Sequence, residues 1–372
     1  MSSEQVSVLT GPARRIIPLV KVGAEEPTKQ QGGRAKEALL AVANDGTATS
    51  ASSSGSQRLQ RQRLWWQMGF FILFVLAPVF DIFRYDLTER HAIIFGMDWR
   101  IGLDDFFAGN ITSLELGGNI LLRVFLPVVG GGVLFIAAAW RWGRLYCGWL
   151  CPHFSVVETI NGLMRHATGK HSVWDKKPVP GRNPDGSVFS VNSKWWLPTV
   201  VLAVGFAFAW AVVFLTYLLP PAEIYGNLWR LEPTRNQTIF LTAATTVLSL
   251  EFLFARHLFC RFGCAVGLFQ SLAWMGNRGA MVVGFKRMRA ADCTTCYAAD
   301  GPGYSACEGV CPMRLRPRMA KSAMFACTQC GQCINACDTV QSKTSETTLL
   351  EWVEHEAAQQ NEATVSLTGR RD

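Results

Sequence analysis

The twelve cysteines of this 372-residue sequence all fall into four short groups. Cysteines that serve only as small core residues would leave some outside any pattern, and disulfide frameworks belong to small domains that lack a sufficient core. The grouping therefore indicates thiolate ligands for metal. Two groups are quartets and two are pairs: Cys293, Cys296, Cys307 and Cys311; Cys327, Cys330, Cys333 and Cys337; Cys147 and Cys151; Cys260 and Cys264.

The second quartet, in "CTQCGQCINACD", has the spacing C-x2-C-x2-C-x3-C with which bacterial ferredoxins hold cubane clusters. Structural zinc is the competing interpretation, because C-x2-C pairs also bind zinc, but three thiols within seven residues favour the cubane. If the quartets cross over as in two-cluster ferredoxins, each cluster takes one ligand from the other quartet. The two predicted [4Fe–4S] ligand sets are Cys293, Cys296, Cys307 and Cys337, and Cys327, Cys330, Cys333 and Cys311.

The first quartet departs from the ferredoxin spacing. Ten residues, "YAADGPGYSA", separate Cys296 from Cys307, where the usual run has two. The turn-forming "DGPG" can loop out without moving the flanking ligands, but it leaves the connectivity of that cluster open. Asp338 follows Cys337, where proline is usual.

Four apolar stretches are long enough to cross a bilayer core of about 30 Å, which takes roughly 20 residues of helix. Tryptophans stand at several of their ends, as in the aromatic belts of membrane proteins. Buried helices of a large soluble protein are the alternative. The predicted spans are Trp65–Phe83, Asn119–Trp140, Trp195–Leu219 and Thr238–Ala255.

The predicted fold is therefore a multi-pass α-helical membrane protein with four transmembrane helices, followed by a small α+β ferredoxin domain of the bacterial two-[4Fe–4S] type. Residues 1–57 are polar and rich in Ser, Ala, Gly and Gln, which predicts a disordered cytoplasmic tail. The remaining boundaries place the membrane domain at 58–289, the ferredoxin-type domain at 290–340 and an acidic carboxy-terminal tail at 341–372.

The basic residues predict the orientation. Arg58, Arg61 and Arg63 precede the first span, and residues 141–194 hold eight Lys or Arg against three acids. The linkers 84–118 and 220–237 hold only three and two basic residues. The positive-inside rule then places both termini on the cytoplasmic side of a bacterial inner membrane. The net charge of +8 is explained by the lipid bilayer as partner, and no nucleic acid is needed.

The two cysteine pairs follow the second and fourth predicted spans and lie at the cytoplasmic face. We call Cys147, Cys151, Cys260 and Cys264 the membrane-face cysteines. Helical positions i and i+4 share a face with β-carbons about 5–6 Å apart, and the two hairpins look like an internal repeat. Four thiols are therefore expected to converge there, and a third cluster, copper or no metal at all are the open alternatives.

Glu251 lies inside the fourth predicted span, where an ionisable side chain is costly enough to suggest a role. One interpretation is that it reaches the inner surface or pairs with Arg256. The other is catalytic, with Glu251 accepting a proton from quinol as electrons leave. His153 and His257 stand beside the cysteine pairs, as either solvated side chains or neighbours of a redox centre.

Residues 65–340 resemble the membrane-bound 4Fe–4S polyferredoxin family. The family includes NapH-type quinol dehydrogenase subunits and the CcoG (RdxA, FixG) accessory proteins of haem–copper oxidases. The resemblance rests on "RLYCGWLCP", "CRFGCAVGLFQS", "IIFGMDW" and the double ferredoxin motif. Ala265 stands where the family usually has proline, and an acidic tail takes the place of the carboxy-terminal β-sandwich of CcoG-type proteins.

The cysteines and the resemblance together predict an electron-transfer protein. It would relay electrons between the quinone pool, or respiratory redox proteins, and an acceptor, through two [4Fe–4S] clusters. As an enzyme it would be an oxidoreductase component, either a quinol dehydrogenase or a cupric reductase. The alternative is copper reduction and metal handling during assembly of a haem–copper oxidase, since soft sulfur ligands suit Cu(I). A redox-sensing regulator is a third hypothesis.

Overall fold

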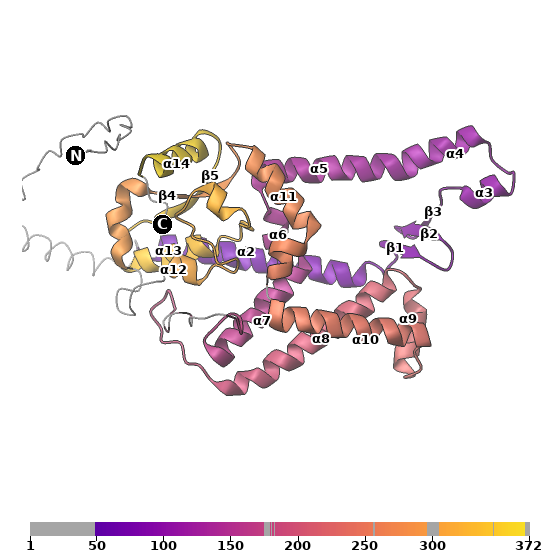
Figure 1. Cartoon of the computed structure of the whole chain (residues 1–372), viewed down its shortest axis with the longest axis horizontal. Coiled ribbons are helices and arrows are strands. Elements are labelled where there is room, and N and C mark those ends of the chain that lie inside the picture. The colour runs from indigo at the N-terminus through magenta and orange to yellow at the C-terminus, as the bar shows by residue number, and fades with distance from the viewer. Residues whose placement is uncertain are drawn as a thin grey trace, which may run out of the picture. The chain divides into compact units, whose positions relative to one another are not determined.

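The computed structural model describes residues 49–174, 179, 181, 183–255, 257–295, 305–344 and 346–368. All of these residues belong to one compact unit, which extends from Ala48 to Asp372. Its long helices run along the horizontal axis of Figure 1, and the cysteine-rich carboxy-terminal region lies at one end of them. These helices are α2 (Thr49–Leu76), α5 (Leu126–Trp142), α8 (Trp196–Thr216) and α10 (Arg235–Leu250).

Three helices in the described residues are long and apolar enough to cross a membrane: Ser113–Trp142, Ser193–Thr216 and Arg235–Ala255. They coincide with the second, third and fourth predicted spans. The first consists of α4 (Ser113–Ile120), the π-helical turn η1 (Leu121–Phe125) and α5, joined without a break. The second begins with the 3-10 turn η2 (Ser193–Trp195), and the third ends with the π-helical turn η3 (Glu251–Ala255).

The helix at the first predicted span differs from the expectation of Trp65–Phe83. It ends at Leu76, because the chain turns there and enters strand β1 (Phe83–Asp86). Its apolar part, residues 64–76, is about 20 Å long at 1.5 Å per residue, which is shorter than a bilayer core of about 30 Å. This helix is therefore not among the three spans.

The other half of α2 is polar and packs against the cysteine-rich region. Ser56 donates hydrogen bonds to Asn335 and Asp338, and Gln60 donates one to the carbonyl of Cys330. These contacts hold the helix from Ser56 onward, and residues 49–57 of the expected disordered tail are helical. Residues 1–48 lie outside the described residues.

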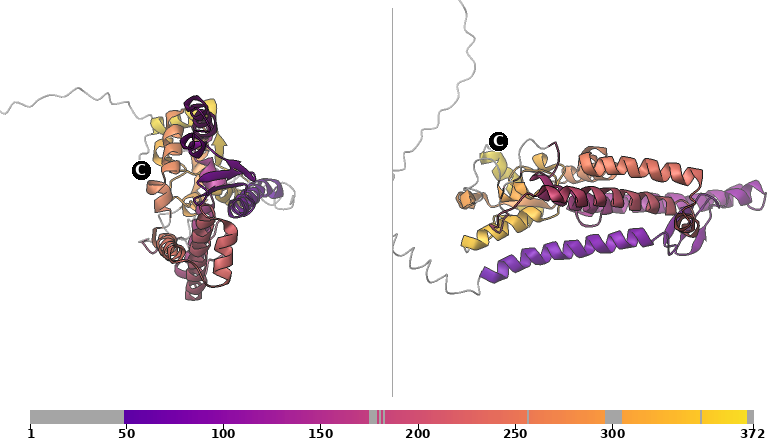
Figure 2. Two further views of the ribbon diagram at one scale, coloured as in Figure 1. Left: turned by 90° about the vertical axis from the view of Figure 1, so that its right-hand side faces the viewer. Right: turned by 90° about the horizontal axis from the view of Figure 1, so that it is seen from below.

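A small antiparallel sheet lies at the opposite end of the long helices from the cysteine-rich region, as Figure 1 and the right-hand view of Figure 2 show. The Tyr85 amide of this sheet donates to the carbonyl of Tyr217, which follows α8, and so ties the sheet to the helix end. The elements at this end are β1, β2 (His91–Ile94), β3 (Met97–Trp99), α3 (Leu103–Phe107) and α9 (Pro221–Trp229).

The helices pack unevenly. Ala203 and Ala207 of α8 are fully buried, and these small side chains allow α7 (Pro152–Thr168) and α10 to approach closely around Trp210. In contrast, none of the apolar window of Ser113–Trp142 is buried. Helix α5 stands apart from α8 and α10 in Figure 1 and contacts α11 (Ala265–Gly276). Its apolar surface is therefore available to lipid.

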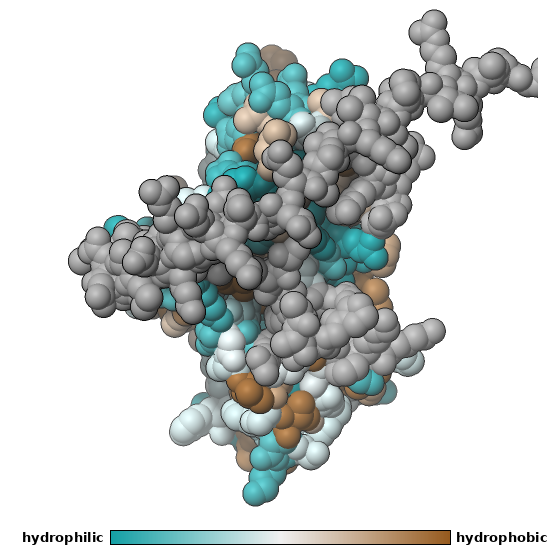
Figure 3. Space-filling model, turned by 90° about the vertical axis from the view of Figure 1, so that its left-hand side faces the viewer, coloured by the Kyte–Doolittle hydropathy of each residue, from teal (hydrophilic) through white to brown (hydrophobic). Residues whose placement is uncertain are grey.

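The cysteine-rich region is closed by a two-stranded antiparallel sheet. Strand β4 (Val282–Phe285) precedes the cysteines and pairs with β5 (Leu350–Val353), which follows them. Figure 3 looks onto the cysteine-rich end of the molecule. In the upper part of this face, most of the coloured residues are hydrophilic. The remaining elements are α6 (Leu145–Trp149), η4 (Phe259–Gly263), η5 (Arg287–Thr295), α12 (Ala306–Gly309), η6 (Lys321–Met324), α13 (Gln332–Gln341), η7 (Ser342–Thr344) and α14 (His355–Thr368).

The limits of this region are wider than the expected 290–340. Strand β4 lies before residue 290, and the expected acidic tail contains β5 and α14. Leu349 and Leu350 are almost fully buried in the same core as Cys333 and Cys337. Burial of these apolar side chains accounts for the order of a segment whose composition alone suggests a solvated tail.

Candidate metal centres

One predicted ligand set surrounds a single cavity. Cys311, Cys327, Cys330 and Cys333 all line it, and most of the other side chains in its wall are apolar. Burial raises the pKa of Cys327 to about 12 and that of Cys333 well above its usual value, and the neighbouring thiols add to both shifts. Free thiols here would stay protonated, whereas a bound metal favours the thiolate. The four thiols therefore fit a cluster.

The other predicted set is seen in part. Burial raises the pKa of Cys307 to about 11, and the thiol of Cys337 contributes to that shift. Arg318 donates to the Cys293 sulfur at 3.6 Å and lies close enough to Cys307 to oppose the shift. Cys293, Cys307 and Cys337 are thus brought to one region. Cys296 and most of the ten-residue insertion lie outside the described residues.

The membrane-face cysteines are not arranged on continuous α-helices, contrary to the expectation. Cys147 lies in α6, which ends at Trp149, and Cys151 is the residue immediately before α7. The cause is Pro152, because the residue before a proline is driven to extended backbone, and Cys151 has φ −61° and ψ 116°.

The second pair repeats this arrangement without the proline. Cys260 lies in the π-helical turn η4, and Cys264 is the extended residue before α11. Each second cysteine therefore sits at the amino terminus of a helix, where the helix dipole and free amides favour a thiolate. For Cys151, the amides of Phe154 and His153 oppose the rise in its pKa to about 11 that burial causes.

The four membrane-face thiols lie within electrostatic range of one another. Burial raises the pKa of Cys260, and Cys151, Cys147 and Cys264 each raise it further. The Cys147 sulfur donates to Gln270 Oε1 at 3.2 Å. In the described part of the chain, no three His, Cys, Asp or Glu side chains are arranged around a single metal ion. A cubane places its thiolates on different iron atoms.

The membrane-face segment touches the ferredoxin-type loop directly. A β-carbon built on Gly148 would lie 2.2 Å from the carbonyl oxygen of Thr328, so the two backbones meet where only glycine fits. Trp149 Nε1 donates to the carbonyl of Gln329 at 2.9 Å, and Arg63 Nε donates to the carbonyl of Gly148 at 2.7 Å. The two candidate centres therefore adjoin.

Glu251 is placed beside a histidine that sequence reasoning did not connect with it. Its Oε1 atom lies 2.9 Å from Nε2 of His153, and the two side chains are 16% and 20% exposed. The rings of Phe252 and Phe259 flank the imidazole. Arg256, the other expected partner, lies outside the described residues. One indication of this pair was present in the sequence, because His153 stands only two residues after Cys151.

An apolar pocket of about 460 Å³ adjoins Cys147. Helices α2, α5, α6 and α11 form its walls, and the hydroxyl of Tyr146 and the amide of Gln270 are its polar groups. Burial raises the pKa of Tyr146 to about 12, so the phenol keeps its proton near neutral pH. The aromatic lining residues are Trp66, Phe135, Trp142, Tyr146 and Trp149.

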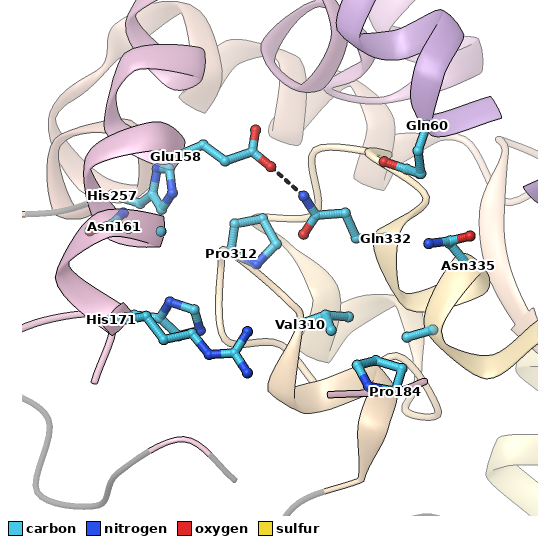
Figure 4. A pocket seen from close by; sticks show the side chains of 13 residues that line it. Gln60, Glu158, Asn161, His171, Pro184, His257, Val310, Pro312, Gln332 and Asn335 are labelled. Atoms are coloured by element: carbon cyan, nitrogen blue, oxygen red, sulfur yellow. Dashed lines mark hydrogen bonds between the residues drawn. The ribbon is translucent and has the colours of Figure 1, made fainter. Parts of the chain in front are cut away.

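A second pocket, of about 390 Å³, lies between α7 and the cysteine-rich region, and most of its wall is formed by polar residues. Figure 4 shows Glu158 accepting a hydrogen bond from Gln332, and Arg63 also pairs with Glu158. Pro312, which follows Cys311, and Ala336 belong to its wall. Residues of α7 and of the cysteine-bearing segments therefore face each other across this pocket.

Comparisons with known proteins agree with this arrangement. The family model of a 4Fe-4S binding domain matches residues 124–171 and 237–280, the two stretches that carry the membrane-face cysteines. YccM of Escherichia coli K12, which is named as an electron transport protein, is 23% identical over 63% of this chain and 57% of its own. RdxA of Cereibacter sphaeroides is 27% identical over 57% of this chain and 43% of its own.

The chain spans about half the length of these curated relatives. An organic cation transporter protein of Drosophila melanogaster is 25% identical over 42% of this chain and 30% of its own. No solved structure matches the chain significantly. The paired cysteines, the apolar helices and the matching 4Fe–4S binding domain together support a likeness to membrane-bound 4Fe–4S electron-transport proteins.

Proposed function

We propose that this protein relays electrons between the quinone pool, or a redox partner, and an acceptor on the cytoplasmic side of a bacterial inner membrane. The contact of Gly148 with Thr328 carries the proposal, because it joins the membrane-face cysteines to a loop bearing two predicted cluster ligands, Cys327 and Cys330. Two [4Fe–4S] clusters, when bound, supply one-electron chemistry. The experiment is anaerobic reduction of the purified protein by quinol, and failure of quinol to reduce any iron–sulfur signal would refute a relay from the quinone pool.

The cysteines hold the clusters in two sets. Cys311, Cys327, Cys330 and Cys333 bind one cluster in the apolar cavity, which excludes water from it. Arg318 lies beside the second set and donates to the Cys293 sulfur. Hydrogen bonds to a ligating sulfur tune the potential of the metal centre. The ligands of the second cluster are Cys293, Cys296, Cys307 and Cys337.

The topology follows from the positions of the basic residues. The arginine-bearing half of α2 packs on the cysteine-rich region, so both lie on the cytoplasmic side with the two termini. The apolar half of α2 enters the membrane from that side as the fourth membrane segment, and turns 77–82 lead from it to the sheet β1–β3 at the opposite end of the long helices. The other three spans cross fully.

The apolar pocket beside Cys147 is suited to a quinone ring. Aromatic side chains stack on flat rings, and the Tyr146 hydroxyl and the Gln270 amide are able to donate to quinone carbonyls. Trp66 is 62% exposed and Trp142 is 38% exposed, so the pocket is reached from the lipid-facing surface of α2 and α5. Its polar end lies next to the membrane-face cysteines.

Filling this pocket is expected to weaken quinol binding. In Ala138→Phe the new ring would occupy the pocket, because Ala138 is part of its wall. The KM for quinol should rise by on the order of tenfold, which corresponds to about 1.4 kcal/mol of binding free energy. Ala137→Phe is the matched control, since Ala137 is exposed on the same helix and does not line the pocket. Equal KM values for the two variants would contradict the assignment.

Glu251 is proposed to accept a proton released by quinol. It does not line the apolar pocket, so the proton must reach it through other groups. Its contact with His153, in the first turn of α7, holds the carboxylate near Cys151. Glu251→Gln keeps the side-chain size and removes the base, so quinol oxidation should slow by about 100-fold or more while iron content is unchanged. Glu232→Gln, at an exposed acid away from the cysteines, should have no effect. Normal turnover of Glu251→Gln in steady-state kinetics would refute this role.

A further inference from the structure

Arg144 is a buried cation without a matching anion. It is 1% exposed, and Nη2 donates to the carbonyl of Cys260 at 2.5 Å. By geometry Nε and Nη1 meet no hydrogen-bond acceptor, although the guanidinium lies close to the Cys147 sulfur, and no ion pair found among the described residues includes Arg144. An uncompensated buried charge costs several kcal/mol. Something negative is therefore expected next to this guanidinium.

The groups around Arg144 are thiols. The charge of Arg144 acts on the Cys147 thiol more strongly than any other charged group does. The same charge also acts on Cys260, whose carbonyl Nη2 contacts, and on Cys327, which belongs to the ferredoxin-type set. Arg144 thus lies between the two candidate centres. Metal-bound thiolates at this place would supply the negative charge that the guanidinium lacks.

The internal repeat gives a built-in comparison. Arg144 stands three residues before Cys147, and His257 stands three residues before Cys260. The guanidinium lies against α11 at Gly267, where a β-carbon would come 2.2 Å from Nη2, while the His257 ring stacks on Phe154 of α7 at 4.7 Å. Each residue thus contacts the helix that follows the other cysteine pair. Only one of the two equivalent positions carries a permanent charge.

We propose that Arg144 is the counter-cation of an anionic centre held by Cys147, Cys151, Cys260 and Cys264 together, and that this centre is a third [4Fe–4S] cluster. Four thiolates carry more negative charge than the cubane core carries positive charge, so one buried cation reduces the net charge of the site. The amino termini of α7 and α11 at Cys151 and Cys264 act in the same direction. The inference rests on the proposed electron-transfer function and adds a third redox centre to it.

The test is the iron content of anaerobically purified full-length protein. Wild type should contain about twelve irons per chain, and Arg144→Met, which keeps the length but not the charge, should contain about eight. Arg144→Lys keeps a positive charge and should retain most of the third cluster. Arg141→Met is the control, because Arg141 is 53% exposed and lies 3.5 Å from Glu354; it should keep about twelve irons.

A second readout is the midpoint potential of the cluster signal in a redox titration. Where Arg144→Gln still assembles the centre, its potential should be lower than in wild type, because the reduced state carries more negative charge and has lost its cation. Unchanged iron and unchanged potentials in Arg144→Met and Arg144→Gln would overturn the inference. Wild type with about eight irons and intact reduction by quinol would overturn it while leaving the proposed function standing. Absence of iron–sulfur signals altogether would refute both.

Should Arg144→Met fail to accumulate, Arg144→Gln decides the matter, since its amide is able to donate to the Cys260 carbonyl that Nη2 now contacts. A merely structural arginine would give a different pattern. Replacing an unpaired buried charge by an apolar side chain of similar volume is often neutral or stabilising. Arg144→Met with a raised melting temperature and full iron would then mark Arg144 as structural and end the proposal.

Discussion

Gly148→Ala should lower the melting temperature of the protein and remove iron from the ferredoxin-type loop. The added β-carbon would lie 2.2 Å from the Thr328 carbonyl oxygen and 3.4 Å from the Cys330 amide nitrogen, and both are backbone atoms that cannot rotate away. Overpacking of this kind costs about 1–3 kcal/mol or more. Because Cys330 is a ligand of the predicted cluster, its movement should also slow electron transfer from the membrane face.

Gly162→Ala is the matched control, since Gly162 lies in the middle of α7 and its β-carbon would have nothing within 4 Å. It should stabilise the protein slightly, because alanine is favoured over glycine inside a helix by roughly 0.5–1 kcal/mol. Thermal denaturation and iron analysis of both variants decide the matter. If Gly148→Ala behaved like Gly162→Ala, the membrane-face segment and the ferredoxin-type loop would not be in contact.

Replacing any one membrane-face cysteine with serine is expected to abolish quinol-linked electron transfer. A cubane or a thiolate-bound copper ion loses a ligand with each replacement, whereas inert core cysteines would suffer only a small packing change. The two ferredoxin-type clusters should remain, because none of their eight cysteine ligands is changed in these variants. The four variants are Cys147→Ser, Cys151→Ser, Cys260→Ser and Cys264→Ser.

The matched control for these variants is Ser155→Ala. The Ser155 hydroxyl donates to the carbonyl of Cys151 at 3.1 Å, so this change perturbs the start of α7 without removing a thiol. Quinol turnover and the amplitudes of the cluster signals are the measurements. Full electron transfer in any one serine variant would refute a shared site. Loss of the ferredoxin-type clusters in all four variants would show that the membrane-face cysteines support the fold and do not form a separate redox centre.

The sequence was most informative where the signal is local. Three predicted spans match long apolar helices, and Cys311, Cys327, Cys330 and Cys333 surround one cavity. The first predicted span fared less well, because hydropathy did not reveal that the chain turns after Leu76 into a strand. Nor does hydropathy report that the amino-terminal half of α2 packs on α13, where Ser56 donates hydrogen bonds to Asn335 and Asp338.

Contacts between distant segments were beyond the reach of the sequence patterns. The pairing of Val282 with Val353 joins strands far apart in the chain, and periodicity does not report partners. The break between Cys147 and Cys151 could have been predicted from Pro152, but the same break before Cys264 has no proline to announce it. Nor does sequence spacing show that Arg144 is buried, since a basic residue near a membrane surface is usually solvated.

Metal analysis separates the main account from copper handling. Two ferredoxin-type clusters with a third at the membrane face require about twelve irons per chain and no copper. Copper bound in proportion to the protein, lost on replacing the membrane-face cysteines, would instead favour metal handling, for which their soft sulfur ligands are suited. Zinc in place of iron at Cys327, Cys330 and Cys333 would contradict the cubane assignment.

The most direct test of an iron–sulfur relay is electron paramagnetic resonance of the anaerobically purified protein, recorded as isolated, after addition of quinol and after full chemical reduction. The account predicts [4Fe–4S] signals that quantify to at least two clusters per chain after full reduction, part of which already appears with quinol. A protein whose spectrum shows no reducible iron–sulfur signal under any of these conditions would contradict it.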